Sequence, residues 1–242
     1  MTRDLSKAPI SRPRKTANRP GRPPRRAGAP DNRERILDVA EAMFAERGFH
    51  GVTIREVTRE AKVDVALVYY YFAHKRDLFD AVFLRRAETL NVERLATIEA
   101  YLAQSAGKPT VEGLVAAFIE PMLDHWVNGG IAWKNYFALV AQVNNTPVWG
   151  GETMARFFNP VVDRLIDGLR LALPGADDQD LYWGYHFLSG ALTLSFACTG
   201  RLDILSGGLC QSEDFASVRV RLPAYVAAGF RQLYEARVSA KQ

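Results

Sequence analysis

The sequence predicts an all-α protein of about nine helices. Beyond residue 30, apolar residues recur every three or four positions through most of the chain, which is the spacing of one helix face. Short alternating apolar and polar runs bounded by turn signals, which would predict β-strands, are absent. Helix starts are also marked, because Thr53 is followed three residues later by Glu56, the spacing of a capping box. With 242 residues, 48% of them hydrophobic, the chain can build a substantial core.

Residues 1–30 are predicted to form a disordered basic arm. They hold nine Lys and Arg side chains, one acid and six of the chain's twelve prolines, but few large apolar groups. Such a segment cannot bury enough apolar surface to offset the entropy of ordering. Its centre, with Arg19, Arg22 and Arg25 among glycine and proline, resembles an AT-hook that lies in the minor groove of DNA. The alternative is a solvated linker that binds phosphates without sequence preference.

Residues 31–80 are predicted to form a helix-turn-helix domain. A first helix runs from Asp31 to Gly48, a second opens at Thr53, a third covers residues 65–71 and a fourth begins at Lys75. Asp64 is expected to cap the third helix. The second and third helices have an apolar back and a front of small, aromatic and hydroxyl side chains, which suits a helix placed in the major groove.

Residues 81–242 are predicted to form a larger helical domain. The fourth helix continues to about Gln104, and five more helices are expected near residues 110–128, 131–144, 152–173, 177–199 and 213–238. Turn residues separate them, for example Gly107-Lys108-Pro109 and Leu173-Pro174-Gly175. A bundle of this kind can serve as a ligand sensor, an oligomerisation module or both.

Four motifs lie between residues 33 and 80. They are Arg35-Ile36-Leu37-Asp38-Val39-Ala40, Phe44-Ala45-Glu46-Arg47-Gly48-Phe49, Val52-Thr53-Ile54-Arg55-Glu56-Val57 and Val68-Tyr69-Tyr70-Tyr71-Phe72-Ala73-His74-Lys75-Arg76-Asp77-Leu78-Phe79. Together they resemble the N-terminal domain of TetR-family transcriptional regulators. The resemblance implies an all-helical homodimer on double-stranded operator DNA, with the third helix of each protomer in successive major grooves. It also implies a ligand-binding C-terminal domain.

The candidate DNA-binding residues follow from these motifs. In the helical domain they are Thr53, Arg55, Val65, Ala66, Leu67, Tyr69, Tyr70, Tyr71 and Lys75. Thr53 and Lys75 are similar to the family's phosphate-contacting positions, and Arg55 could reach a guanine edge or a phosphate. Tyr71 stands where histidine is frequent in the family, and Leu67 where threonine or alanine is common, so the base preference cannot be carried over.

Aromatic side chains crowd the middle of the C-terminal domain. The candidate ligand-binding residues are Phe118, Met122, His125, Trp126, Trp133, Tyr136, Phe137, Trp149, Met154, Phe158 and His186. Aromatic residues at helical spacing are often plain core, but as a group these predict a sizeable apolar pocket with few polar groups. In the family that the chain resembles, these helices enclose the inducer. A small hydrophobic, aromatic or acyl effector is therefore expected.

The last two predicted helices resemble the dimer-forming pair of that family. One carries Tyr182, Tyr185, His186, Ser189, Gly190, Leu192, Thr193 and Phe196, and the other carries Val218, Leu222, Val226, Phe230 and Leu233. A symmetric four-helix contact between two copies is expected, and a two-fold protein reads a pseudo-palindromic site.

Several other function classes are disfavoured. The four histidines lie far apart without metal-ligand spacing, and no glycine-rich phosphate loop follows a strand, so no catalytic residue, metal or cofactor is expected. Two cysteines are too few for a disulfide scaffold, and no apolar run reaches the length of a membrane span. The expected location is the cytoplasm, in association with the nucleoid.

The sequence thus favours a ligand-responsive transcriptional repressor, a homodimer released from a pseudo-palindromic operator by a small hydrophobic inducer. Two alternatives remain open. One is a DNA-binding or architectural protein without a small-molecule ligand, and the other is an activator.

Overall fold

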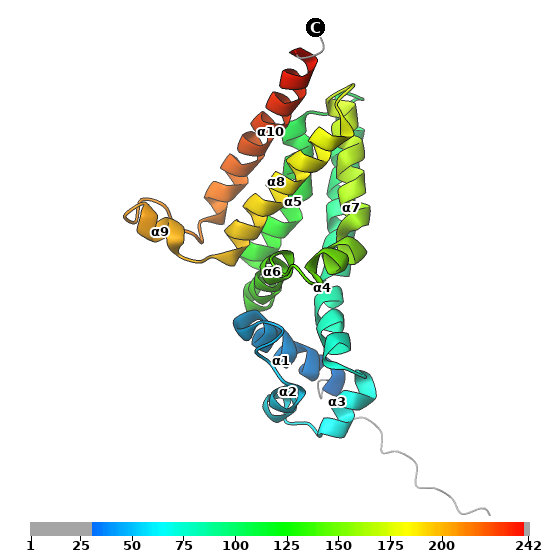
Figure 1. The fold of residues 1–242 in the computed structure, drawn as a ribbon, viewed down its shortest axis with the longest axis vertical. Helices are drawn as coiled ribbons and strands as arrows, with labels where there is room; N and C mark the ends of the chain where they lie inside the picture. The colour runs from blue at the N-terminus through cyan, green and yellow to red at the C-terminus, as the bar shows by residue number, and fades with distance from the viewer. Residues whose placement is uncertain (1–30, 240–242) are drawn as a thin grey trace, which may run out of the picture. The chain divides into compact units, whose positions relative to one another are not determined.

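The computed structural model describes residues 31–239, and their side chains as far as residue 236. These residues form ten α-helices and no β-strand, which confirms the predicted all-α class (Figure 1). The helices are α1 Asn32–Arg47, α2 Ile54–Ala61, α3 Val65–Tyr71, α4 Lys75–Gln104, α5 Val111–Asn128, α6 Gly130–Asn144, α7 Gly150–Ala172, α8 Asp178–Ala197, α9 Arg201–Leu205 and α10 Phe215–Ser239. The predicted arm, with Arg19, Arg22 and Arg25, lies outside the described residues.

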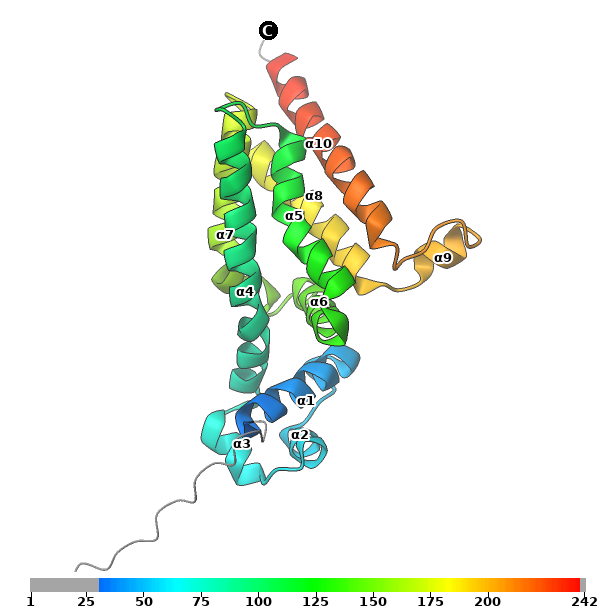
Figure 2. The same ribbon diagram turned by 180° about the vertical axis from the view of Figure 1, so that it is seen from behind.

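Helices α1 to α3 pack around a small apolar centre at one end of α4 (Figures 1 and 2). Ile36, Phe44 and Val57 are fully buried in it. The Thr53–Glu56 capping box is present at the start of α2, and the Asp64 side chain accepts from the backbone N–H of Ala66, as predicted. These caps satisfy backbone donors that the helices cannot pair themselves, and so they fix where α2 and α3 begin.

The remaining long helices form a bundle. Helix α4 packs on α5 and α7, α6 packs on α8, and α10 lies against both α5 and α8. Figure 1 shows α8 in front of α5, and Figure 2 shows the reverse from behind. No helix of the described part is long and apolar enough to cross a membrane.

Helix α4 takes part in both the small domain and the bundle. Its 30 residues span about 45 Å at 1.5 Å per residue. The predicted domain boundary between residues 80 and 81 therefore falls inside a continuous helix. Helix α1 is also tied to α4 directly, because Arg85 and Arg86 both donate to the carboxylate of Glu41, which is only 2% exposed.

The short helix α9 was not predicted. It lies in an extension between α8 and α10 that projects to one side of the bundle (Figures 1 and 2). Five residues are too few to show a helical period in the sequence. The extension is tied internally by the Asp203 carboxylate, which accepts from the backbone N–H and the hydroxyl of Ser212.

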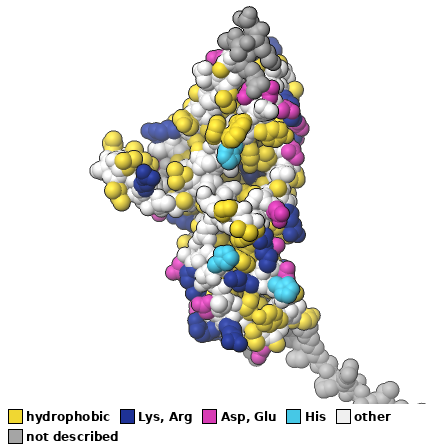
Figure 3. Space-filling view, viewed as in Figure 1, with side chains coloured by type: hydrophobic (Ala, Val, Ile, Leu, Met, Phe, Trp, Pro, Cys, Tyr) yellow, Lys and Arg dark blue, Asp and Glu magenta, His cyan; other side chains and the backbone are white. Residues whose placement is uncertain are grey.

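The inner faces of α8 and α10 differ from the predicted dimer surface. Leu192 and Phe196 of α8 are buried in this chain. So are three residues of α10 that were predicted to contact a second copy: Leu222, Val226 and Phe230. These side chains pack within the bundle of one chain. Gly184 makes the close approach possible, since a Cβ atom there would overlap the ring of Phe230. The outward face of α8 is a different one, on which Trp183, Phe187 and Leu194 are exposed. Figure 3 shows hydrophobic side chains gathered on the face of the molecule where α8 lies in Figure 1.

Candidate functional site

Helix α3 presents an exposed row of tyrosines. Val68 inside the helix and Phe72 just after it are buried, so they hold α3 on the small domain. Tyr69 is 54% exposed and Tyr70 is 80% exposed. Val65 and Ala66 at the helix start are exposed too, while Leu67 and Tyr71 are half-buried. The sequence-predicted residues of α3 therefore share one solvent-facing surface.

Thr53 is engaged by its own helix. Its backbone N–H and hydroxyl both donate to Oε2 of Glu56, at 2.8 and 2.7 Å, and Arg47 donates to the other carboxylate oxygen at 2.9 Å. The hydrogen bonds from the Thr53 side chain and backbone, followed by that from Arg47, lower the pKa of Glu56 to about 2. For an approaching phosphate this leaves the free N–H groups of the first turn of α2, such as that of Arg55.

Lys75 holds the loop between α1 and α2. Its ammonium donates to the carbonyl oxygens of Phe49 at 2.7 Å and Val52 at 2.9 Å, and lies 4.3 Å from the centre of the Phe49 ring. Desolvation lowers its pKa below the ordinary value. The Lys75 side chain thus holds the loop between α1 and α2 against the start of α4, and this role was not predicted from the sequence. Its predicted phosphate contact would have to use the one remaining N–H.

Two exposed cations near α3 were missed in the sequence. Arg59 follows the exposed Arg55 by one helical turn on α2, and Lys62 ends that helix in the left-handed conformation. The four-residue spacing of Arg55 and Arg59 was the available signal, because such residues lie on one helix face. Helix α3 itself carries no basic residue, so the positive charges beside it come from neighbouring segments, such as α2.

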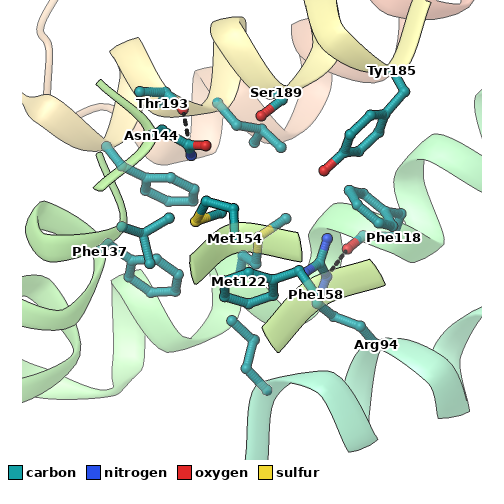
Figure 4. A pocket seen from close by; sticks show the side chains of 14 residues that line it. Arg94, Phe118, Met122, Phe137, Asn144, Met154, Phe158, Tyr185, Ser189 and Thr193 are labelled. Carbon is teal, nitrogen blue, oxygen red and sulfur yellow. Dashed lines mark hydrogen bonds between the residues drawn. The ribbon is translucent and has the colours of Figure 1, made fainter. Parts of the chain in front are cut away.

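A small cavity lies inside the bundle, enclosed by α4 to α8 (Figure 4). Its volume is about 50 Å³. A buried water needs roughly 10–15 Å³ of such space, so the cavity has room for a few waters. It is lined by Leu90, Arg94, Phe118, Met122, Phe137, Val140, Asn144, Met154, Phe158, Tyr185, Ser189, Leu192, Thr193 and Phe196.

Five of the predicted ligand residues line this cavity: Phe118, Met122, Phe137, Met154 and Phe158. Asn144 also lines it and donates to the hydroxyl of Thr193 at 3.0 Å. These side chains come from α5, α6 and α7, whose apolar faces converge there.

The other six predicted ligand residues do not line the cavity: His125, Trp126, Trp133, Tyr136, Trp149 and His186. Trp126 stacks on Phe215 with ring centres 4.2 Å apart. Tyr136 is fully buried, and its ring packs against other aromatic rings of the core. These two positions belong to the apolar packing of the bundle.

His125 and Trp133 form a stacked pair outside the cavity, with ring centres 3.6 Å apart, and Nε2 of His125 pairs with Glu93. Trp149 lies where the bundle meets the small domain, packed against the rings of Phe49 and Phe79. His186 is exposed on α8. Each side chain points where its helix rotation and its neighbours direct it, which aromatic spacing alone cannot reveal.

Arg94 is the one charged residue of the cavity lining, and the sequence prediction missed it. The lining residues of α8 were predicted for the dimer surface instead: Tyr185, Ser189, Leu192, Thr193 and Phe196. Arg94 is only 4% exposed, and its Nε donates to the carbonyl oxygen of Phe118 at 3.1 Å (Figure 4). Desolvation lowers its pKa to about 10, so it is charged at neutral pH. Arg94 stands between Leu90 and Ile98 at four-residue spacing, as a lone charge in an apolar stripe of α4. That interruption was the signal available in the sequence.

Comparison with known proteins identifies the family to which both parts of the chain are similar. Residues 36–82 match the family described as bacterial regulatory proteins, tetR family, and residues 116–229 match the tetracyclin repressor-like C-terminal domain. The chain belongs to the TetR family of transcriptional regulators. It is therefore a DNA-binding regulator, and the TetR-family match at residues 36–82 covers α2 and α3, including the exposed tyrosines of α3.

Curated TetR-family relatives match mainly the small domain. The regulator HbdR of Aromatoleum sp. (strain CIB) is 40% identical over 48 residues, which are 20% of this chain and 21% of HbdR. The repressor BepR of Brucella suis biovar 1 (strain 1330) is 37% identical over 60 residues, 25% of this chain and 29% of BepR. The chain thus matches less than a third of the length of either relative. Both are regulators and not enzymes.

Solved TetR-family structures share the fold over most of the chain. FadR from Bacillus subtilis in complex with stearoyl-CoA has a TM-score of 0.56 at 14% identity, over 81% of this chain and 98% of that one. The fatty acid degradation regulator FadR from Bacillus halodurans has a TM-score of 0.52 at 13% identity, over 85% and 96%. At such identities the likeness concerns the fold.

Proposed function

We propose that this chain is a homodimeric repressor that leaves its operator when a small apolar effector enters the cavity of the bundle. In this proposal it acts in the cytoplasm on nucleoid DNA. The observation that carries the proposal is that one helix, α4, both lines the cavity with Leu90 and Arg94 and begins directly after the reading helix α3. A change in the cavity can therefore move the reading surface.

The contacts between the bundle and the small domain support such coupling. Arg76 of α4 donates to the Thr153 hydroxyl of α7 at 2.7 Å, and Gln142 of α6 donates to the carbonyl of Ala45 in α1 at 2.7 Å. A shift of α4 against α6 and α7 would strain these bonds and turn α1 to α3 with it. The effector changes operator affinity only if it binds the two arrangements with different affinity.

In the proposed complex, α3 lies in the major groove with the tyrosines toward the bases. Phosphates are contacted by the start of α2, by Arg55 and Arg59, and by the arm. Residues 31–80 carry eight basic and ten acidic side chains, so the small domain has no net positive charge. Most of the electrostatic attraction to DNA is then assigned to the nine basic residues of the arm.

The proposed dimer uses the outward faces of α8 and α10. Trp183 and Phe187 stack with ring centres 5.8 Å apart and are exposed, as are Leu194 of α8 and Tyr225 of α10. An open groove of about 720 Å³ between this face and the α9 extension is continuous with it and is lined by Leu194, Leu202, Leu205, Leu209 and Tyr225. Apolar surface of this extent suits a second copy of the chain.

The test is operator retardation with effector candidates. DNA fragments that the purified chain selects from genomic DNA are shifted in a gel, with and without a panel of apolar carboxylates, amides and alcohols. The proposal expects one chemical class to abolish the complex. A second candidate function, a DNA-binding protein without an effector, is favoured by the small volume of the cavity. A complex that resists every ligand would support that candidate and contradict the effector proposal.

A further inference from the structure

The guanidinium of Arg94 is buried with most of its hydrogen-bonding capacity unused. An arginine side chain has five N–H donors, and the structure pairs one of them, Nε–H, with the carbonyl of Phe118. The charge also lies 3.8 Å from the centre of the Phe118 ring, a cation–π contact. Among the described side chains, no Asp or Glu forms an ion pair with it. The cavity therefore holds a positive charge without a counter-ion.

A buried charge without a counter-ion destabilises a fold, because burial removes most of its hydration. The neighbouring phenols report the resulting positive field. Burial raises the pKa of Tyr136 and of Tyr185, and the charge of Arg94 acts in the opposite direction on both. The same field would favour any negative charge placed in the cavity.

We propose that the effector is an apolar monocarboxylate, with its carboxylate paired to Arg94 and its apolar body among the aromatic and methionine side chains of the cavity. This inference rests on the proposed function, because it names the chemical class of that effector. A planar carboxylate accepts two parallel N–H bonds from the fork of one guanidinium. Arg94 is the one cationic side chain of the lining, so a single negative charge balances the site.

Two hydroxyl groups face Arg94 from the other side of the cavity. In Figure 4 the hydroxyls of Tyr185 and Ser189, both on α8, point from above into the space that the guanidinium enters from α4 below. A carboxylate has about four acceptor sites, so it can take bonds from the guanidinium and from a phenol together. Its binding would link α4 to α8 across the cavity.

The volume of the cavity limits the size of the apolar body that fits without a rearrangement of side chains. About 50 Å³ holds a few waters, so an effector larger than these must displace neighbouring side chains. Met122 and Met154 are the unbranched members of the lining, and their flexible side chains can repack around a guest. Because Leu90 and Arg94 of α4 line the same cavity, enlarging it would push on the helix that begins directly after α3.

The experiment compares matched ligands by calorimetric titration of the full chain: octanoate against octanamide, and benzoate against benzamide. Each pair shares its apolar body and differs in its head group, a charged carboxylate or a neutral amide. We expect at least one carboxylate to bind about tenfold or more tightly than its amide, since a charge-assisted pair replaces a neutral one. In Arg94→Met the preference should disappear, while the thermal midpoint is kept or raised, because methionine fills the space without a charge.

The controls separate this inference from the proposed function. Arg170→Met removes an exposed arginine of α7 that pairs with Asp167 and Asp178, and it should leave the carboxylate preference unchanged. Equal binding of acid and amide would overturn the anion site and leave the effector cavity standing. If no ligand of either kind bound the wild-type chain, both the inference and the effector cavity would fail. A preference that persisted in Arg94→Met would show that another residue carries it.

Discussion

Glu41 shows how one carboxylate joins the reading domain to α4. It is almost fully buried and accepts from both Arg85 and Arg86. Replacing it with alanine leaves two arginines without their buried partner, so Glu41→Ala should lower the free energy of unfolding by about 3 kcal/mol. Urea denaturation measures this. Glu34 is the matched control, because it pairs with the same Arg85 but is half exposed, and Glu34→Ala should cost less than about 1 kcal/mol.

The capping box at α2 predicts that the stability of the fold depends on pH. Hydrogen bonds from Thr53 and Arg47 lower the pKa of Glu56 from 4.5 to about 2, so the charged form is favoured in the folded state. A carboxyl group whose pKa is lowered by folding stabilises the fold at pH values above its pKa in the unfolded chain. This stabilisation is lost as the pH falls through its pKa in the folded state. The wild-type chain should be more stable than Glu56→Gln above pH 4.5, and the difference should shrink toward pH 2. Thermal melts of both proteins across this range measure it; a constant difference would contradict the assignment.

Helix boundaries could be predicted from the sequence because they depend on local chemistry. Thr53 and Asp64 cap with their own side chains, and α3 and α4 begin and end where they were predicted. Helix rotation depends on tertiary packing. Helix α8 is apolar on most of its circumference, so the sequence could not show that Leu192 and Phe196 face inward while Phe187 faces out. The same ambiguity placed His186 in the ligand site. Trp149 precedes α7, so its position depends on how the connection between α6 and α7 packs.

At the scale of α3, the exposed Tyr70 offers a clean test of the reading surface. Tyr70→Ala removes a side chain that is 80% exposed, so stability should change by less than about 0.5 kcal/mol. Affinity for selected DNA should fall about tenfold, as expected for one lost base contact. Fluorescence anisotropy with labelled DNA measures the affinity. Val92→Ala, an exposed residue of α4, is the control and should leave affinity unchanged.

At the scale of α8, the outward apolar face predicts the assembly. Phe187→Arg places a charge in the centre of the proposed contact between two copies, so the dimer should dissociate. Sedimentation equilibrium measures the mass. Leu171→Arg on α7 introduces the same charge at an equally exposed position outside that face and should leave the dimer intact. A Phe187→Arg variant that remained dimeric would rule out this face.

For the whole molecule, the basic arm is predicted to supply most of the salt-dependent attraction to DNA. Deleting residues 1–30 removes nine cations, so the plot of log affinity against log salt should flatten by about 0.9 for each lost phosphate contact. A variant with Arg19, Arg22 and Arg25 changed to lysine keeps the charge. The AT-hook interpretation predicts a preference for A·T-rich flanks, which this lysine variant should lose. If the variant keeps that preference, the AT-hook interpretation is wrong and the arm binds phosphates alone.

In the proposed complex, α3 of two protomers reads a specific DNA site. Selection of binding sequences from a random DNA pool, with the wild-type chain and with Tyr69 and Tyr70 both replaced by alanine, tests this proposal. The wild-type chain is expected to enrich a pseudo-palindrome whose half-sites lie about one helical turn apart, and the variant is expected to lose the enrichment while remaining folded and dimeric. Enrichment of the same sequence by both proteins would contradict this proposal.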